Sequence, residues 1–517
     1  MSSFMNTLSF IRANRVRRWA TAMSTGAVLG SAACTLLLDR TSTQCQSDGD
    51  CAKFGGHAFC RGGWCVASGL GPSDCFYGTP QQQRDFLNQC STAQCLSFDN
   101  CGRLHLCGTA ASTPPPIAPP AANASAPSPS AGGADAGAMP NCMDPTSGRT
   151  QLVYISGSSN FPPLLAKLAP IIIAAGGPTP VFQITNSCTG IKSIFSSVQD
   201  DHFIRDPAAG SGITKYAAYF GPDGSQVPCL LGPSGASVDI GESDIFSTTC
   251  PGSPMVGNAV NESFGPNQAM AFVVPGASAQ STISEEAARE VFGLGGNDGL
   301  AVPWTDPARI FVRNANTGTQ QMIGHAIGVP ADQFWGIDQG TASSMDQGLK
   351  VLNGLEAEQA IGIISVDWYD NDRKNLKALA YKAQGQECAY LPDSTPDSMD
   401  KQNVRDGHYP IWGPIHFFTA NPLPAAAGAF LSIVAVPKVA TSVLDAFIAA
   451  SLIPTCAMVV QRDNELGSLQ PYSAPFQCGC YFESKKGTPG SECIPCSGSS
   501  DCPAVRPACN LNFCEVQ

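Results

Sequence analysis

The chain has 517 residues, enough for roughly two to four domains and at least one large hydrophobic core. Its formal net charge at pH 7 is -12, which argues against nucleic-acid binding because such proteins concentrate lysine and arginine. Its 23 cysteines indicate an oxidising compartment outside the cytoplasm.

The first 33 residues have the features of a secretory signal peptide. A basic segment, RANRVRR, precedes a modestly apolar stretch that ends in Ser31-Ala32-Ala33. These small residues suit ordinary signal peptidase, and they also stand directly before Cys34, as in bacterial lipoprotein signals. Lipidation at Cys34 therefore stays an open alternative. No later stretch reaches membrane-spanning length, so we expect membrane contact only through this possible anchor.

Composition divides the rest of the chain into four parts. Residues 34–107 and 476–517 are cysteine-rich and show little periodic apolar pattern. Residues 108–141 are rich in Ala, Pro, Ser and Gly, which is typical of a semi-extended linker. Residues 142–475 alternate short apolar strands with amphipathic helical segments, and we expect the main domain there.

The two cysteine-rich parts share a cysteine pattern. CQSDGDCAKFGGHAFCRGGWC (45–65) and CSGSSDCPAVRPACNLNFC (496–514) both contain C-x5-C, a loop of variable length, and C-x4-C. A fixed cysteine pattern with a variable loop predicts a small disulfide module, because such segments cannot build a core alone. A zinc site through Cys493 and Cys496 is the alternative and fits poorly outside the cytoplasm.

The main domain is expected to contain strands and helices in alternation. In chain order we expect strand 152–156, helix 163–177, strand 180–185, helix 190–198, strand 269–276, helix 284–295, strand 310–312, a helix after 319, strands 360–370 and 376–382, and helix 437–453. Such alternation predicts an α/β fold with mostly parallel sheets. In these sheets, ligands bind at the carboxyl ends of the strands.

Four loops between expected strands and helices are rich in small hydroxyl and amide residues: GSSNFP (157–162), NSCTGIK (186–192), GESD (241–244) and RNANTGT (313–319). The last of them places Arg313 at the end of a strand and Thr317-Gly318-Thr319 at the start of a helix. Unpaired N–H groups at a helix N-terminus, hydroxyl donors and a guanidinium together favour an anion.

The order of these loops resembles that in the phosphate-binding proteins of bacterial ABC phosphate transporters, which are type II periplasmic binding proteins. The segments that carry the resemblance are ISGSSNFPPLLAKL, TNSCTGIKSIF, VDIGESD, AVPWTDPARIFVR, RNANTGT and EQAIGIISVDWY. The resemblance covers about residues 150–450 and neither cysteine-rich end. It implies an α/β, two-lobed type II periplasmic-binding-protein fold, flanked here by small disulfide-rich modules.

The resemblance also implies a set of phosphate-binding residues: Asn160, Phe161, Ser187, Asp244, Arg313, Thr317, Gly318 and Thr319. Thr189 is the alternative to Ser187. Asp244 would select for phosphate, because phosphate still carries a proton that it can donate, whereas sulfate does not. For Arg313 the alternative is an ion pair at the rim of the cleft, and for Asp244 it is a helix N-cap.

The sequence departs from the family pattern at four positions. Asn160 replaces the usual Thr, Ala315 replaces an Asp, Asn316 replaces a Gly, and Glu242 replaces a small residue. In the family pattern, the Asp that Ala315 replaces is expected to orient the arginine of the site, here Arg313. Glu242 either substitutes for it or faces solvent, and we expect the solvated position.

An insertion relative to the family lies between Gly190 and Val238 and contains Cys229. We expect Cys229 to pair with Cys188 or Cys250, near the mouth of the cleft.

The predicted function is an extracytoplasmic solute-binding protein that captures inorganic phosphate between two lobes for an ABC transporter permease, in the periplasm or at the cell surface of a bacterium. A surface interaction or adhesion protein that reuses the fold is one alternative, and a receptor for another oxyanion is another. The six histidines lack metal-ligand spacing, and no nucleophile motif is recognisable, so we expect neither an enzyme nor a metal or other cofactor.

Overall fold

The computed structural model describes residues 59–61, 64–66, 75–76, 78–104, 139–144, 149, 151–208, 213–257, 259–297, 299–487, 490 and 493–516. The chain divides into two compact units, Met1–Gly78 and Thr79–Gln517. The expected signal peptide, Cys34 and most of the expected linker lie outside the described residues. Within the described part of the chain, no helix is both long and apolar enough to cross a membrane.

Similar short hairpins occur near both ends of the chain. In the first unit, β1 (Phe59–Arg61) and β2 (Trp64–Val66) pair antiparallel, with Cys60 opposite Cys65. In the second unit, β20 (Ala508–Asn510) and β21 (Phe513–Glu515) pair in the same way, with Cys509 opposite Cys514. The shared cysteine pattern of the two ends therefore corresponds to a shared hairpin.

The cysteines of the C-terminal part form disulfides, as predicted. The pairs are Cys456–Cys478, Cys480–Cys493, Cys496–Cys509 and Cys502–Cys514. Cys493 and Cys496 thus have different disulfide partners, which excludes the zinc alternative at these two residues. The one cysteine cluster with metal-like spacing among the described residues is Cys496, Cys502 and Cys514, and all three of its members are disulfide-bonded.

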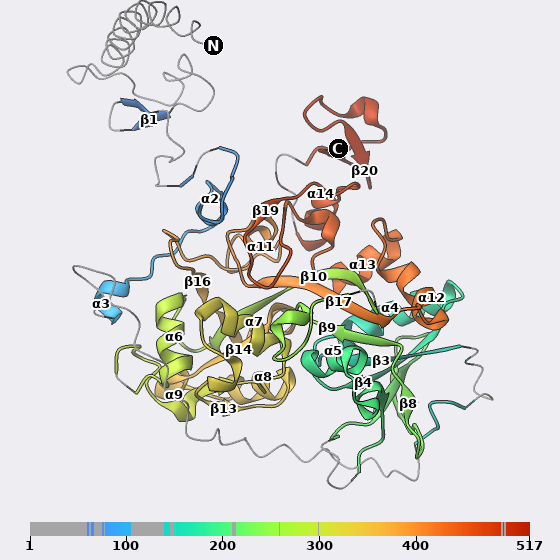
Figure 1. The fold of residues 1–517 in the computed structure, drawn as a ribbon. Coiled ribbons are helices and arrows are strands. Elements are labelled where there is room, and N and C mark those ends of the chain that lie inside the picture. The colour runs from blue at the N-terminus through green and yellow to red at the C-terminus, as the bar shows by residue number, and fades with distance from the viewer. Residues whose placement is uncertain are drawn as a thin grey trace, which may run out of the picture. The chain divides into compact units, whose positions relative to one another are not determined.

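An 11-stranded mixed sheet forms the centre of the second unit (Figure 1). The strand order is β13-β12-β14-β10-β17-β9-β3-β4-β6-β7, and β15 also pairs with β10. The strands are β3 (Leu152–Gly157), β4 (Thr179–Ile184), β6 (Ala217–Phe220), β7 (Gln226–Cys229), β9 (Ile240–Ser243), β10 (Val260–Pro275), β12 (Ile310–Val312), β13 (Ile337–Asp338), β14 (Ile361–Ser365), β15 (Leu376–Ala378) and β17 (Trp412–Ala420).

The sheet contains two lobes with the same strand order. The first lobe holds the parallel strands β4, β3 and β9, and the second holds β13, β12 and β14. In the first lobe, β17 lies between β9 and the first half of β10. In the second, the other half of β10 lies between β14 and β15. The same strand order in both lobes, with β10 and β17 shared as described, confirms the predicted two-lobed α/β fold class.

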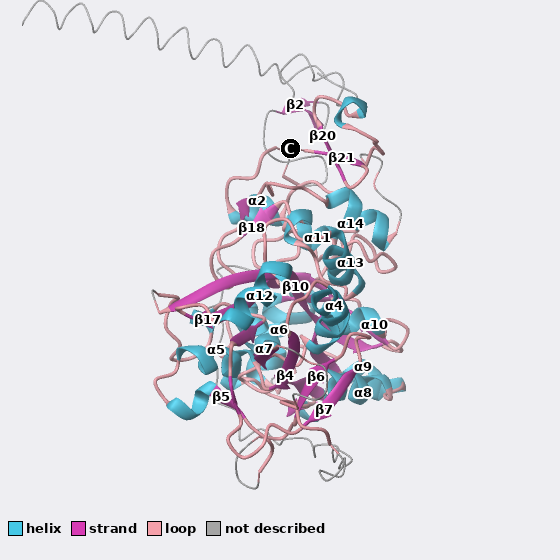
Figure 2. Cartoon of the chain, turned by 90° about the vertical axis from the view of Figure 1, so that its right-hand side faces the viewer, coloured by secondary structure: helices cyan, strands magenta, loops and turns pink. Residues whose placement is uncertain are grey.

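Helices cover each lobe. The first lobe carries α4 (Pro162–Ala174), α5 (Ser187–Phe195), α12 (Ala425–Val434) and α13 (Thr441–Ala449), and Figure 2 shows α4, α12 and α13 close together. The second lobe carries α6 (Glu285–Leu294), α7 (Gly318–Ile327), α8 (Ala342–Lys350), α9 (Gly354–Gln359) and α10 (Val366–Asn371). Side-chain caps start several of these helices: Asn186 for α5, Ser284 for α6, Thr317 for α7 and Thr341 for α8.

The prediction of mostly parallel sheets is wrong, because the large sheet is mixed: β10, β17, β6 and β7 pair antiparallel with their neighbours. Single elements also differ from the prediction. The strand expected at 360–370 ends at Ser365 and continues as α10. The strand expected at 376–382 is two short strands, β15 and β16 (Ala380–Lys382), which belong to different sheets. Strand β17 was not predicted, because Gly413 and Pro414 interrupt its apolar pattern.

Residues 79–104 pack against the second lobe. A disulfide joins Cys95 to Cys388, and Leu96 forms a β-bridge with Ala389. The expected domain boundaries within this unit stay predictions. The remaining elements are α2 (Gln83–Leu87), α3 (Asn100–Leu104), β5 (Phe203–Ile204), β8 (Ala236–Ser237), β11 (Thr282–Ser284), α11 (Gln402–Asp406), β18 (Val460–Gln461), β19 (Gln470–Pro471), α14 (Gly479–Lys486) and short 3-10 turns.

Candidate functional site

The four predicted loops converge where the two lobes meet. Three of them follow the carboxyl ends of β3, β4 and β9 in the first lobe, and the fourth follows β12 in the second lobe. Because parallel strands end at the same edge of a sheet, their loops are brought together within each lobe. The site is therefore built from both lobes.

Asp244 lies at the centre of this convergence. It is 1% exposed, and its Oδ2 accepts hydrogen bonds from three groups. These are the Ser158 hydroxyl at 2.6 Å, the Asn160 amide at 3.1 Å and the Ser187 hydroxyl at 3.3 Å. Burial raises the pKa of Asp244, and the hydrogen bonds and the charge of Arg313 offset part of this effect. Asp244 is not a helix N-cap, since Phe246 occupies the cap of the short turn that follows.

Arg313 enters the site from the second lobe and is 2% exposed. Its Nη2 donates to the Ser159 hydroxyl at 3.0 Å, and its Nε donates to the Gly340 carbonyl at 3.4 Å. Its Nη1 has no hydrogen-bond partner among the described residues. Burial lowers the pKa of Arg313 to about 10, so the side chain is still a cation at neutral pH. The alternative of an exposed ion pair at the rim is therefore wrong.

Other contacts also cross between the lobes. The backbone N–H of Gly318 donates to the Ser187 hydroxyl at 3.0 Å. The Asn160 amide reaches the Thr319 hydroxyl at 3.4 Å. Residues that the sequence predicted as one site are thus in direct contact, and their role as ligands of an anion stays a prediction.

Thr317 and Phe161, two of the predicted site residues, make contacts that shape the loops around Asp244. Thr317 caps α7, with its hydroxyl accepting from the Gln320 N–H and donating to the Asn314 carbonyl. The Phe161 ring is buried in the first lobe against Phe182 and Phe417. Thr317 therefore shapes the helix N-terminus, and Phe161 anchors the first loop.

Ser158 and Ser159 are site residues that the sequence reasoning did not single out. Ser158 donates to Asp244, and Ser159 accepts from Arg313. The signal for both was present in the serine pair of GSSNFP. Both serines could have been predicted as site residues, because they are hydroxyl residues in the same loop as Asn160.

Glu242 is fully buried, so the expectation of a solvated acid is wrong. All four residues of its strand, β9, are buried, and its carboxylate lies against Gly157 and Ser158 of the first loop. One carboxylate oxygen accepts from the Ser158 N–H at 2.7 Å, and the other has no hydrogen-bond partner among the described residues. Burial, and then the charge of Asp244, raises the pKa of Glu242 well above its ordinary value.

Gly157 makes room for this carboxylate. A Cβ at position 157 would lie 2.3 Å from Oε2 of Glu242. The glycine of the first loop and the acid of the third loop are thus fitted to each other.

The disulfide expectation for Cys229 is also wrong. Cys229 ends β7 and pairs with Cys142, whose N–H bonds to the neighbouring Leu230 carbonyl. Cys188 pairs with Cys250 instead. This second disulfide connects the loop of Ser187 to the segment that follows Asp244.

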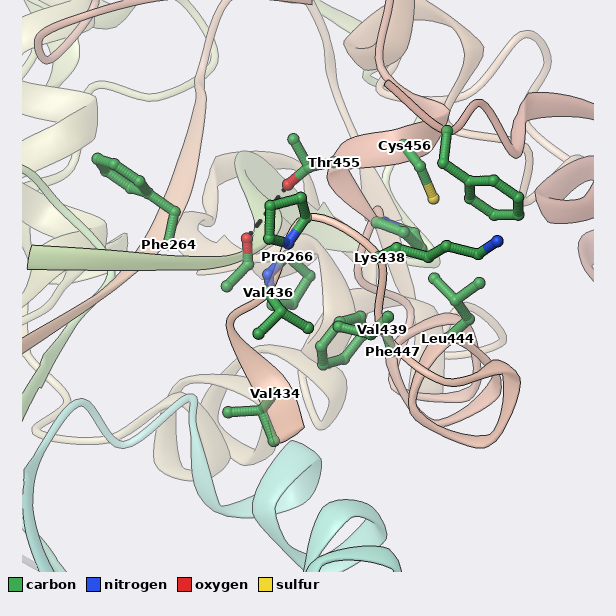
Figure 3. Close-up of a pocket in the computed structure, with 14 residues that line it drawn as sticks. Phe264, Pro266, Val434, Val436, Lys438, Val439, Leu444, Phe447, Thr455 and Cys456 are labelled. Carbon is green, nitrogen blue, oxygen red and sulfur yellow. Dashed lines mark hydrogen bonds between the residues drawn. The ribbon is translucent and has the colours of Figure 1, made fainter. Parts of the chain in front are cut away.

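A separate hollow, shown in Figure 3, is a poor candidate for a ligand site. It is lined mainly by apolar side chains, among them Phe264, Pro266, Val434 and Leu444, and its volume is ≈ 40 Å³. The Thr455 hydroxyl donates across it to the Gly265 carbonyl. A space of this size holds little more than a water molecule.

No protein-family model and no curated protein matches the chain. Several solved structures are similar in fold. A phosphate ABC transporter substrate-binding protein with bound phosphate from Clostridium perfringens is 15% identical, with a TM-score of 0.40, and the match covers 59% of this chain and 100% of that chain. An ABC-type phosphate transport receptor from Vibrio cholerae is 15% identical, with a TM-score of 0.36 and coverages of 58% and 99%.

A protein of another kind has a similar score. OxyR from Corynebacterium glutamicum is 7% identical, with a TM-score of 0.31, and the match covers 59% of this chain and 66% of that chain. At such identities and scores the likeness concerns the fold alone.

Proposed function

We propose that this chain is an extracytoplasmic solute-binding protein that captures an inorganic oxyanion, with phosphate as the first candidate, between its two lobes. The observation that supports this most is the group around Asp244. One buried carboxylate oxygen gathers donors from two loops of the first lobe, while the buried Arg313 approaches from the second lobe.

Such a group suits an anion that carries a proton. Arg313, the Gly318 N–H and the hydroxyl and amide groups can donate to ligand oxygens, and Asp244 can accept the ligand's proton. Burial strengthens each of these interactions because water no longer competes. Closure of the two lobes on the anion then provides affinity, and no chemical step follows. The expected partner is an ABC transporter permease.

The test is equilibrium binding of labelled phosphate to the full chain after exhaustive dialysis, with sulfate as the competitor. We expect saturable binding that sulfate does not displace. Arg313→Ala should remove it, whereas Arg309→Ala should not, because Arg309 lies at the other end of β12 and pairs with Glu356 at the surface. Asp244→Asn should reduce the preference for phosphate over sulfate, since the amide can donate to sulfate.

Two outcomes would support other functions. Equal binding of sulfate or another oxyanion by the unaltered chain would favour a different ligand, which the replacements Asn160 and Ala315 allow. Failure of the folded chain to bind any oxyanion would favour the interaction protein, in which the cysteine-rich ends carry the function.

A further inference from the structure

A second hollow in the same unit has features of a ligand site and shares no residue with the site around Asp244. Its volume is ≈ 360 Å³, within the range of small-molecule pockets. It lies between β10, β17 and the segment from Met458 to Tyr472. Four aromatic side chains line it: Phe246, Phe264, Trp412 and Tyr472.

Arg462 is the buried cation of this hollow. It is 7% exposed, and its guanidinium carbon lies 4.4 Å from the centre of the Trp412 ring. All three guanidinium nitrogens are buried without a hydrogen-bond partner among the described residues, and so is the Trp412 indole nitrogen. Leaving such donors unpaired is costly, so a buried arginine of this kind calls for an acceptor.

The acidic groups around the hollow do not supply that acceptor. Glu262 is bonded to His416 at 2.7 Å, and Asp463 accepts from Gln470 at 3.3 Å. Glu465 uses Oε2 for the Phe246 N–H and the Thr249 hydroxyl, and its Oε1 is buried without a hydrogen-bond partner among the described residues, Arg462 included. Burial raises the pKa of Glu465 to about 7, so near neutral pH this acid neutralises Arg462 only in part.

We propose that this hollow binds a small organic acid, with its carboxylate on Arg462 and its apolar or aromatic body against Trp412, Phe264 and Tyr472. A guanidinium matches a carboxylate with two parallel hydrogen bonds. Phe264 is 48% exposed and gives the ligand body an apolar surface to cover. An inorganic oxyanion would leave these aromatic faces unused. This inference does not rest on the proposed function.

The experiment is calorimetric titration of the full chain with phenylacetate and, separately, with phenethyl alcohol, which has the same ring and no charge. We expect saturable binding of phenylacetate, and binding of the alcohol that is weaker by about tenfold or more, the loss of one charge-assisted contact. Arg462→Gln should weaken phenylacetate by a similar factor. Arg309→Gln and Arg313→Ala should leave it unchanged, because neither residue lines this hollow.

Three results would overturn the proposal: no saturable binding of phenylacetate, equal binding of the alcohol, or unchanged binding by a folded Arg462→Gln variant. If Arg462→Gln does not fold, the comparison of acid and alcohol on the unaltered chain still decides. Loss of phosphate binding in Arg313→Ala, with phenylacetate binding retained, would show that the two sites are separate.

Discussion

The Ser187 hydroxyl accepts a hydrogen bond from the Gly318 N–H at 3.0 Å and donates one to Asp244 at 3.3 Å. Ser187 and Asp244 belong to the first lobe and Gly318 to the second. This pair of contacts therefore joins the lobes at the point where an anion would be held. The approach is close enough that position 318 has no room for a side chain.

Gly318→Ala is expected to weaken phosphate binding by about tenfold or more. A Cβ at this position would lie 2.6 Å from the Ser187 hydroxyl and 2.7 Å from Cβ of Asp244. Overpacking of this kind costs about 1–3 kcal/mol. Because the contacts join different lobes, the cost falls on lobe closure rather than on the folding of either lobe. Labelled-phosphate binding measures the first effect, and urea unfolding measures the second.

The matched control is Gly257→Ala, since a Cβ at position 257 meets no atom within 4 Å. Its phosphate affinity should equal that of the unaltered chain. Unchanged affinity in Gly318→Ala would contradict the view that the observed contact between Ser187 and Gly318 forms part of the ligand-bound state.

Much of this arrangement could be predicted from the sequence, because each loop carries a local signal. An apolar strand precedes Arg313, and a capped helix follows it, so the end of β12 and the start of α7 were readable in chain order. The same reasoning placed Asn160, Ser187 and Asp244 after strands. Their meeting at one point then follows from the parallel pairing of β4, β3 and β9.

The rest depends on neighbours that are distant in sequence. The burial of Glu242 depends on residues that are distant in the chain: Phe417 of β17 lies opposite it, and the apolar pattern of β17 is broken by Gly413 and Pro414. The pairing of Cys229 depends on which segment reaches the edge strand β7, and residues next to Cys142 do so. Neither fact has a local signal in the sequence.

The Cys188–Cys250 disulfide is expected to affect both stability and binding. Cys188 is the neighbour of Ser187, and Cys250 follows Asp244 by six residues. The Ser187 hydroxyl donates a hydrogen bond to Asp244, so the disulfide links the two segments that carry this contact. Replacing both cysteines with serine should lower the free energy of unfolding by about 2–4 kcal/mol. It should also weaken phosphate binding several-fold, because the disulfide no longer fixes the position of the Ser187 loop relative to the segment after Asp244. Urea unfolding and phosphate titration of the double variant measure these effects.

The Cys142–Cys229 pair is the control for this experiment. It spans 87 residues against 62 for Cys188–Cys250, so the loss of stability should be similar. Its cysteines do not contact the Asp244 group, and phosphate affinity should be retained. Equal losses of affinity in the two double variants would show that only general stability is involved.

Glu242 is expected to make the stability of the fold depend on pH. Its pKa is raised well above the ordinary value of 4.5, so the folded chain holds this proton more tightly than the unfolded chain. The tighter binding of this proton in the folded chain adds to the free energy of unfolding. This added stability is complete at low pH and is lost as pH rises from about 4.5 through the folded-state pKa. Glu242→Gln cannot lose a proton, and it should be more stable than the unaltered chain at about pH 8.

Urea unfolding at about pH 5 and about pH 8 tests this, and the advantage of Glu242→Gln should shrink at the lower pH. Glu387→Gln, at an exposed position, serves as the control for replacing a glutamate with glutamine. An advantage of the same size at both pH values would mean that the proton on Glu242 is not the cause.

The helix cap at Thr317 has an equivalent at Thr341 in the same lobe. The Thr317 hydroxyl caps α7 through the Gln320 N–H, and the Thr341 hydroxyl caps α8 through the Ser344 N–H. Thr317→Ala and Thr341→Ala should each lower the free energy of unfolding by about 0.5–2 kcal/mol, the usual cost of a lost cap. Only Thr317→Ala should also weaken phosphate binding, because the α7 cap positions the Gly318 N–H. If both variants lose equal stability and both keep full affinity, the N-terminus of α7 does not contribute to binding.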